Sequence, residues 1–268
     1  MTDQELLAFN AKGFIPGPNE TEEQFLKRIE ITRQSYVRES LPRAHLEWTK
    51  HHLSQLFGFE PESLIAFYSN ENLTPWQGAA CWIDEKGVST LQLRKGFQKG
   101  RYLRLYSREE ILSHEAIHAA RSAFHEPENE EFFAYSSSEK KWRRVLGPII
   151  KRPWEVWGFL GSLLLALFFD WGVHLALFWI CTGFSRLTIQ HLRRFRACKN
   201  LKKQGQDNTK IRAILFRLTD QEIRQLAKGE TLKSDDTLRW RLLHLIAARS
   251  QQSPHDLFQE KVKTLFLP

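Results

Sequence analysis

The chain has 268 residues, of which 42% are hydrophobic and 26% are charged. This composition excludes a disordered protein and suffices for one or two compact domains. Its net charge of +8 is unevenly distributed. Residues 1–139 carry 15 Lys and Arg against 21 Asp and Glu, residues 140–203 carry 13 against 2, and residues 204–268 carry 11 against 8. Positive charge confined to one middle segment disfavours a nucleic-acid-binding protein, so we expect no nucleic-acid partner.

The cysteines and the N-terminus indicate the compartment. Cys81, Cys181 and Cys198 form no close pair and no C-x-x-C spacing, which favours a reducing compartment. Residues 1–10 contain no basic stretch followed by an apolar core, so we expect no secretory signal. We therefore expect the first part of the chain to stay in the cytoplasm.

The first 139 residues combine helical and strand patterns. A capping box at Thr21 and Gln24 predicts a helix from about 21 to 38, and a second helix is expected over 42–56. The pattern then changes to short apolar or alternating runs separated by turn residues, which predicts a small antiparallel sheet. These runs lie at 64–68, 79–83 and 90–94.

A possible metal site lies in the sequence SREEILSHEAIHAAR at 107–121. Ser107 and Glu110 form another capping box in front of a strong helix pattern. His114 and His118 are four residues apart and so share one helix face, where two imidazoles can bind one Zn²⁺. Glu115 lies about 100° further round the helix and can take a proton from the attacking water. Roughly 0.03 such H-E-x-x-H motifs are expected by chance in this composition.

A catalytic zinc normally has three protein ligands, and the acidic run at 126–131 offers the third. Pro127 is expected to end one segment, so that a new helix begins after it and packs beside the first. We favour Glu131 because Ala134 lies near the same face and would let the two helices approach closely. Glu130, the alternative, shares its face with the bulky Phe133. His125 is a weaker candidate.

The pattern His114-Glu115-x-x-His118 followed by Glu130-Glu131-x-x-Ala134 resembles the gluzincin branch of zinc metallopeptidases, over roughly residues 62–138. The resemblance implies His114, His118 and Glu131 as zinc ligands and Glu115 as general base. It also implies that the strand near 90–95 is an edge on which an extended peptide can lie.

The sequence departs from this family at one position. Tyr135 stands where many members carry an Asp that orients a histidine, so the orienting group is not identified from the sequence. Tyr102, Tyr106 and Tyr135 are candidates for stabilising the oxyanion.

An apolar stretch over 154–184 contains Asp170 near its middle. A single crossing helix would place this carboxylate near mid-bilayer, at a cost of about 2.5 to 3.5 kcal/mol. A helical hairpin with its turn at Asp170 avoids that cost. It also leaves both basic flanks on the cytoplasmic side. Each arm has an apolar core of only about 21 Å against about 30 Å of hydrocarbon, so the hairpin either draws in flanking residues or lies in one leaflet.

The sequence therefore predicts an α+β protein in three parts: a zincin-like domain over 1–139, a membrane hairpin over 140–203 and a helical module over 204–268. We expect a membrane-anchored, cytoplasm-facing peptidase that uses a zinc-activated water to hydrolyse peptide bonds, with a peptide or protein substrate and membrane lipid as partners. The alternative is a membrane-tethered binding or scaffold protein whose zincin-like fold has lost catalysis.

Overall fold

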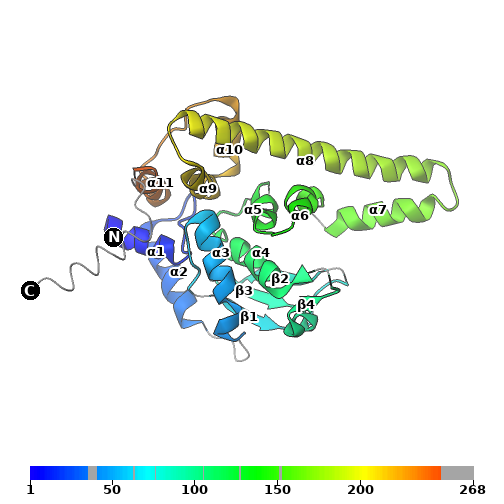
Figure 1. The fold of residues 1–268 in the computed structure, drawn as a ribbon, viewed down its shortest axis with the longest axis horizontal. Coiled ribbons are helices and arrows are strands. Elements are labelled where there is room, and N and C mark those ends of the chain that lie inside the picture. The colour runs from blue at the N-terminus through cyan, green and yellow to red at the C-terminus, as the bar shows by residue number, and fades with distance from the viewer. Residues whose placement is uncertain are drawn as a thin grey trace, which may run out of the picture.

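A computed structural model describes residues 1–248, except 36–40, 63, 76, 105, 127 and 151–152. Three expectations therefore lie outside the described residues: the end of the first predicted helix beyond residue 35, the break at Pro127, and residues 249–268 of the C-terminal module. The described part is an α+β fold in which a small sheet lies at one side of a mostly helical body (Figure 1).

The elements follow in chain order. They are α1 (Asp3–Ala11), α2 (Glu22–Gln34), η1 (Arg43–His45), α3 (Glu47–Phe57), β1 (Ile65–Tyr68), β2 (Ala79–Ile83), β3 (Ser89–Leu93), η2 (Lys95–Lys99), β4 (Arg101–Tyr102), β5 (Tyr106–Ser107), α4 (Arg108–Ala120), α5 (Glu130–Ser136), α6 (Lys141–Leu146), η3 (Gly147–Ile149), α7 (Pro153–Leu165), α8 (Trp171–Lys203), α9 (Asn208–Phe216), α10 (Asp220–Lys228) and α11 (Leu238–Ala248). The second predicted helix starts as the short 3-10 turn η1 and continues as α3, and α1 was not predicted.

The main sheet is mixed, so the expectation of an antiparallel sheet is wrong in part. Its strand order is β1-β3-β2, with β3 parallel to β1 and antiparallel to β2. The tight turn between β2 and β3 uses Asp84, whose carboxylate accepts from the backbone N–H of Val88 at 2.8 Å, and Gly87 at a φ of 78°. Because β3 is the central strand, it is not the edge that the resemblance implied. In the described residues, the edge strands of this sheet are β1 and β2.

Helix α4 packs against β2 and β3. Ser107 caps it as predicted, since its hydroxyl accepts from the N–H of Glu110 at 3.2 Å. Glu110 does not complete a capping box, because its carboxylate is buried against Arg143 at 2.8 Å and accepts from the Ser138 hydroxyl. This ion pair joins the start of α4 to α6.

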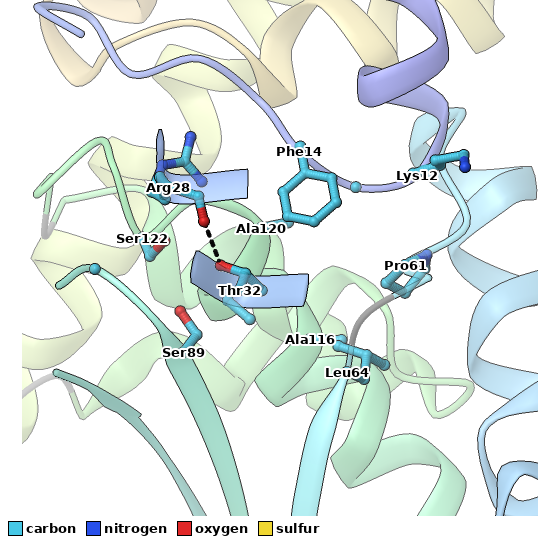
Figure 2. A pocket seen from close by; sticks show the side chains of 13 residues that line it. Lys12, Phe14, Arg28, Thr32, Pro61, Leu64, Ser89, Ala116, Ala120 and Ser122 are labelled. Carbon is cyan, nitrogen blue, oxygen red and sulfur yellow. Dashed lines mark hydrogen bonds between the residues drawn. The ribbon is translucent and has the colours of Figure 1, made fainter. Parts of the chain in front are cut away.

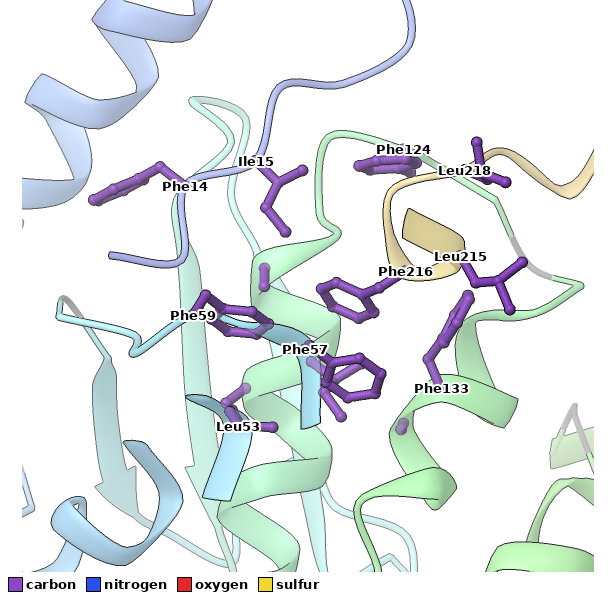
Figure 3. Close-up of a cluster of buried hydrophobic side chains, with 14 of the residues drawn as sticks. Phe14, Ile15, Leu53, Phe57, Phe59, Phe124, Phe133, Leu215, Phe216 and Leu218 are labelled. Atoms are coloured by element: carbon purple, nitrogen blue, oxygen red, sulfur yellow. The ribbon is translucent and has the colours of Figure 1, made fainter. Parts of the chain in front are cut away.

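The C-terminal helices share one hydrophobic core with the N-terminal part (Figure 3). Phe216, at the end of α9, stacks on Phe57 with ring centroids 4.4 Å apart and meets the edge of Phe133 at 5.4 Å. Arg121, at the end of α4, is fully buried and donates to the carbonyl of Phe216. The composition boundary at 204 is therefore not a boundary between separate cores.

Helices α7 and α8 form an antiparallel pair that extends from the body (Figure 1). Asp170 precedes α8 at the turn, as predicted, and Arg186 of α8 holds Glu155 of α7 through two hydrogen bonds of 2.7 and 2.8 Å. Leu167 and Phe168 at the turn are 75% and 72% exposed. Within the described residues, α8 is the helix long and apolar enough to cross a membrane, while the apolar part of α7 is shorter.

Candidate metal centre

Three side chains from α4 and α5 converge on one point. The Nε2 atoms of His114 and His118 lie 3.3 Å apart. The Glu131 carboxylate places one oxygen 3.6 Å from His114 Nε2 and the other 3.7 Å from His118 Nε2. Ligands about 2.0 to 2.1 Å from a tetrahedral metal lie about 3.3 to 3.4 Å apart, so the triangle is close to this size. Among the described residues, this group can hold a metal ion.

Local structure explains why Glu131 is the glutamate that joins the two histidines. Helix α5 begins at Glu130 and packs beside α4, and its Ala134 is fully buried. This small side chain lets the two helices approach closely. The prediction that Glu131 and not Glu130 joins the two histidines agrees with this geometry. His125, the weaker candidate, is not a member of the group.

Glu130 has a different position, which the sequence did not reveal. The Nδ1–H of His118 donates to a Glu130 oxygen at 2.8 Å, on the side of the ring away from Nε2. A carboxylate at this nitrogen fixes the ring orientation and the tautomer that presents Nε2 to a metal. Glu130 can therefore orient His118, a role for which the sequence offered no carboxylate at Tyr135. In the sequence, the two adjacent glutamates could have indicated that one of them orients a histidine.

The two histidines differ in charge. Burial, with the nearby His118 and Arg143, holds the pKa of His114 well below its usual value, so this ring is neutral. Burial also opposes protonation of His118. There, the hydrogen bond to Glu130 and the charges of Glu131 and Glu115 outweigh burial and raise its pKa to about 9. Metal binding must therefore displace a proton from His118.

Glu115 lies beside the three ligands as a buried carboxylate, only 8% exposed. Burial is the main cause that raises its pKa to about 7, with a further contribution from Glu131 and an opposing one from His118. A carboxylate with a pKa raised this far is a stronger base than an exposed one, which suits proton transfer near neutral pH.

Of the three tyrosines considered, Tyr135 contacts a ligand. Its ring meets the edge of the His114 ring with centroids 4.7 Å apart. Tyr106 packs instead against the guanidinium of Arg143, and Tyr102 against Phe97. Gly147 lies against the ring of Tyr135, since a Cβ at Gly147 would lie 2.2 Å from the tyrosine ring.

The sheet edge β2 borders the same region. It contacts α4, and within the part of the chain that the structure describes its hydrogen-bonded neighbour is β3 alone. Trp82 and Ile83, at its end, are 45% and 46% exposed. An unpaired strand edge with exposed apolar side chains can accept an extended peptide by strand addition.

A small cavity lies on the opposite face of α4 (Figure 2). Ala116 and Ala120 line it, about 200° to 240° round the helix from His114. Its volume of about 40 Å³ suits a water molecule or two and excludes a substrate side chain. This cavity is therefore too small to be a substrate site.

In comparisons with protein families, characterised proteins and solved structures, no match to this chain was found. The gluzincin resemblance accordingly depends on the motif and on the geometry of the site.

Proposed function

We propose that this protein is a membrane-anchored zinc peptidase. The observation that carries the proposal is the convergence of His114, His118 and Glu131 beside the buried carboxylate of Glu115. Two imidazoles and one carboxylate form a frequent ligand set of catalytic zinc, which keeps a fourth position for water or substrate. In the described residues, the neighbouring strand edge β2 supplies a place for an extended peptide.

In this proposal, each residue of the site has a separate chemical role. Zinc, when bound, supplies Lewis acidity that polarises the scissile carbonyl and acidifies the attacking water. Glu115 accepts the proton of that water and delivers it to the leaving amine. Tyr135, packed on His114, donates a hydrogen bond to the oxygen that develops negative charge. Glu130 holds the His118 ring in place throughout.

The helical pair α7–α8 supports membrane anchoring. Its outer surface is covered with exposed large apolar side chains, which a soluble protein rarely gathers in one patch. The outer ends of α7 and α8 both join the rest of the protein, and basic residues flank both helices. By the positive-inside rule, the body faces the cytoplasm.

The decisive experiment measures zinc and turnover in the same preparations. Purified protein is expected to hold about one zinc per chain, and His118→Ala is expected to lose most of it, since two ligands bind zinc poorly. His51→Ala is the control, because His51 is exposed and lies on α3. Glu115→Gln is expected to keep zinc and lose peptide hydrolysis, because it removes the base and no ligand.

The outcomes separate the two functional classes. Equal zinc in wild type and His118→Ala would refute the metal centre. Zinc bound by His118 without hydrolysis of any peptide in a diverse library would instead favour the binding or scaffold protein.

A further inference from the structure

Helix α6 exposes an apolar face that is bordered by basic side chains. Trp142, Val145 and Leu146 lie side by side round the helix at about 100° per residue, and the first two are 55% and 49% exposed. Lys141 and Arg144 lie at one edge of these three and are exposed as well. We call these five residues the α6 face. Exposed apolar side chains that gather in one patch mark an interaction site.

The two basic residues of the α6 face have no acidic partner in the described part of the chain. Residues 140–152 contain six Lys and Arg and no Asp or Glu. One of the six, Arg143, is buried and pairs with Glu110 at 2.8 Å. The two on the α6 face enter no ion pair among the described residues, not even with the exposed Glu139 close by in sequence. The α6 face therefore presents positive charge beside apolar surface, which suits an anionic lipid surface.

The place of α6 along the helical pair matches the surface of a bilayer. In Figure 1, α6 lies on the side of the body from which α7 and α8 extend. The ring of His191, in α8, hydrogen-bonds the carbonyl of Val145 through Nε2 at 3.0 Å. His191 follows Trp171, the first residue of α8, by twenty residues, which is about 30 Å of helix and equals the hydrocarbon thickness of a bilayer. A pair that crosses the bilayer therefore places α6 at the level of the lipid headgroups.

The polarity of the chain between α6 and α7 follows the same depth. The carbonyl of Ile149, in η3, accepts from Arg186 at 2.6 Å, five residues nearer the turn than His191. The chain thus descends about 7 Å from the basic α6 face to Ile149 and the exposed Ile150, which are both apolar. Arg186 itself is neutralised at this depth by Glu155. Basic residues outside apolar ones are typical of a segment that lies in the membrane interface.

We propose that α6 and η3 lie on the cytoplasmic surface of the membrane and that Lys141 and Arg144 bind the headgroups of anionic phospholipids. Trp142 and Val145 then insert between those headgroups, where tryptophan is enriched in membrane proteins. A basic residue near an anionic leaflet gains about fivefold in affinity. This inference rests on the membrane anchoring in the proposed function and not on the peptidase activity. It names the lipid class and the element that binds it.

The metal centre borders the proposed lipid surface. Gly147, the first residue of η3, lies against the ring of Tyr135, and α6 packs against α5, which carries Glu131. Neighbouring helices lie about 8 to 10 Å apart. The group of His114, His118 and Glu131 is therefore about one helix width from the headgroups.

The test uses the full chain, with its three natural cysteines replaced by alanine, in vesicles of phosphatidylcholine. A fluorescent label at Val145→Cys reports contact with a minor lipid that carries a nitroxide near its headgroup, since a nitroxide quenches only at short range. The minor lipid is either phosphatidylglycerol or phosphatidylcholine, at the same fraction. Labels at Phe168→Cys, at the turn of the pair, and at the exposed Glu230→Cys report insertion of the pair and the water phase. For Phe168→Cys, lipid with a nitroxide at the chain end is used as well.

We expect the label at position 145 to be quenched several-fold more strongly by the anionic lipid, because two basic residues favour it by about fivefold each. Lys141→Gln combined with Arg144→Gln should keep the contact with lipid and remove this preference. The matched control combines Lys202→Gln with Lys203→Gln, at two exposed positions at the end of α8. It removes the same charge about 16 Å beyond the hydrocarbon, more than a Debye length, and should keep the preference.

Three other outcomes would overturn the proposal. Quenching at Phe168→Cys without quenching at Val145→Cys would overturn it and keep the membrane anchor. Quenching at neither position would refute the anchor and the proposal together. Equal quenching by the two lipids, or the same preference in the two double variants, would overturn the binding of anionic headgroups. Because none of these results depends on zinc or turnover, failure of the peptidase function would leave the inference unaffected.

Discussion

His118 donates from Nδ1 to Glu130 at 2.8 Å, so its other nitrogen is directed to the point where His114 and Glu131 meet. Two adjacent glutamates thus contact one histidine in different ways: Glu130 binds the Nδ1 side of the ring, and Glu131 lies on the Nε2 side in the group that can hold a metal ion. Both stand in the first turn of α5, which packs against α4.

This arrangement predicts that Glu130→Gln weakens zinc binding without abolishing it. The amide keeps a hydrogen-bond acceptor but loses the charge that makes the imidazole a better ligand. Outer partners of this kind typically contribute 10- to 100-fold in affinity, and we expect a loss of about that size. Competition with a chelator measures it. Glu139→Gln, at an exposed position after α5, should bind zinc like wild type, and an unchanged affinity in Glu130→Gln would contradict the orienting role.

The position of Tyr135 predicts a loss of turnover in Tyr135→Phe. The ring would keep its contact with His114, so zinc should stay bound, but the hydroxyl that stabilises the oxyanion is removed. Loss of one such donor costs about 10²- to 10³-fold in kcat. Tyr102→Phe is the control, because Tyr102 packs against Phe97 and away from the ligands. A normal kcat in Tyr135→Phe would assign the oxyanion to another donor.

A substitution at Gly147 is expected to displace Tyr135 as well. A methyl group there would lie 2.2 Å from the Tyr135 ring, so Gly147→Ala must displace that ring or α6. We expect an overpacking cost of about 1 to 3 kcal/mol in the free energy of unfolding, together with a lower kcat at full zinc occupancy. Gly161→Ala, inside α7, should leave kcat unchanged and should not lower the free energy of unfolding, since no atom lies within 4 Å of its added Cβ and alanine favours a helix. Chemical unfolding and steady-state kinetics on the two variants decide the point.

Because the core is shared, we expect Phe216→Ala to lower the free energy of unfolding strongly. This ring is fully buried between Phe57 and Phe133, and removal of a buried phenylalanine costs about 3 to 5 kcal/mol. Phe195→Ala, at a position 68% exposed, should change stability by less than about 0.5 kcal/mol. Unfolding in guanidinium should show one transition for wild type. Two transitions, with Phe216→Ala affecting only one of them, would mean that the C-terminal helices fold separately.

The hairpin predicts that both soluble ends face the cytoplasm. Single cysteines at the exposed positions Glu85 and Glu230, in a chain whose three natural cysteines are alanine, should react with an impermeant thiol reagent only after the membrane is broken. Labelling at Glu230→Cys in intact cells, without labelling at Glu85→Cys, would show that the apolar segment crosses once. Permeabilised cells provide the control for reactivity.

Features fixed by short-range patterns were predictable from the sequence. The capping box at Thr21, the helix with His114 and His118, and the turn at Asp170 each depend on residues a few positions apart. The missed helix α1 carries the same kind of signal, because Thr2 and Glu5 form a capping box.

Features that depend on distant contacts were not predictable in this way. The parallel pairing of β1 with β3 depends on where the β2–β3 hairpin docks, which no local pattern records. The burial of Phe216 against Phe57 joins segments about 160 residues apart in the chain. The role of Glu130 required the position of the His118 ring, which only the packing of α5 on α4 defines.

The junction of Phe57, Phe133 and Phe216 also has a consequence for biosynthesis. During translation, the ribosome makes Phe57 and Phe133 before the apolar helices, and Phe216 after them. The aromatic surface of Phe57 and Phe133 therefore stays open until α7 and α8 have been made and the chain has reached residue 216. Chaperones and proteases recognise open apolar surface of this kind. The N-terminal part is thus expected to reach its final stability only after synthesis has passed the helical pair.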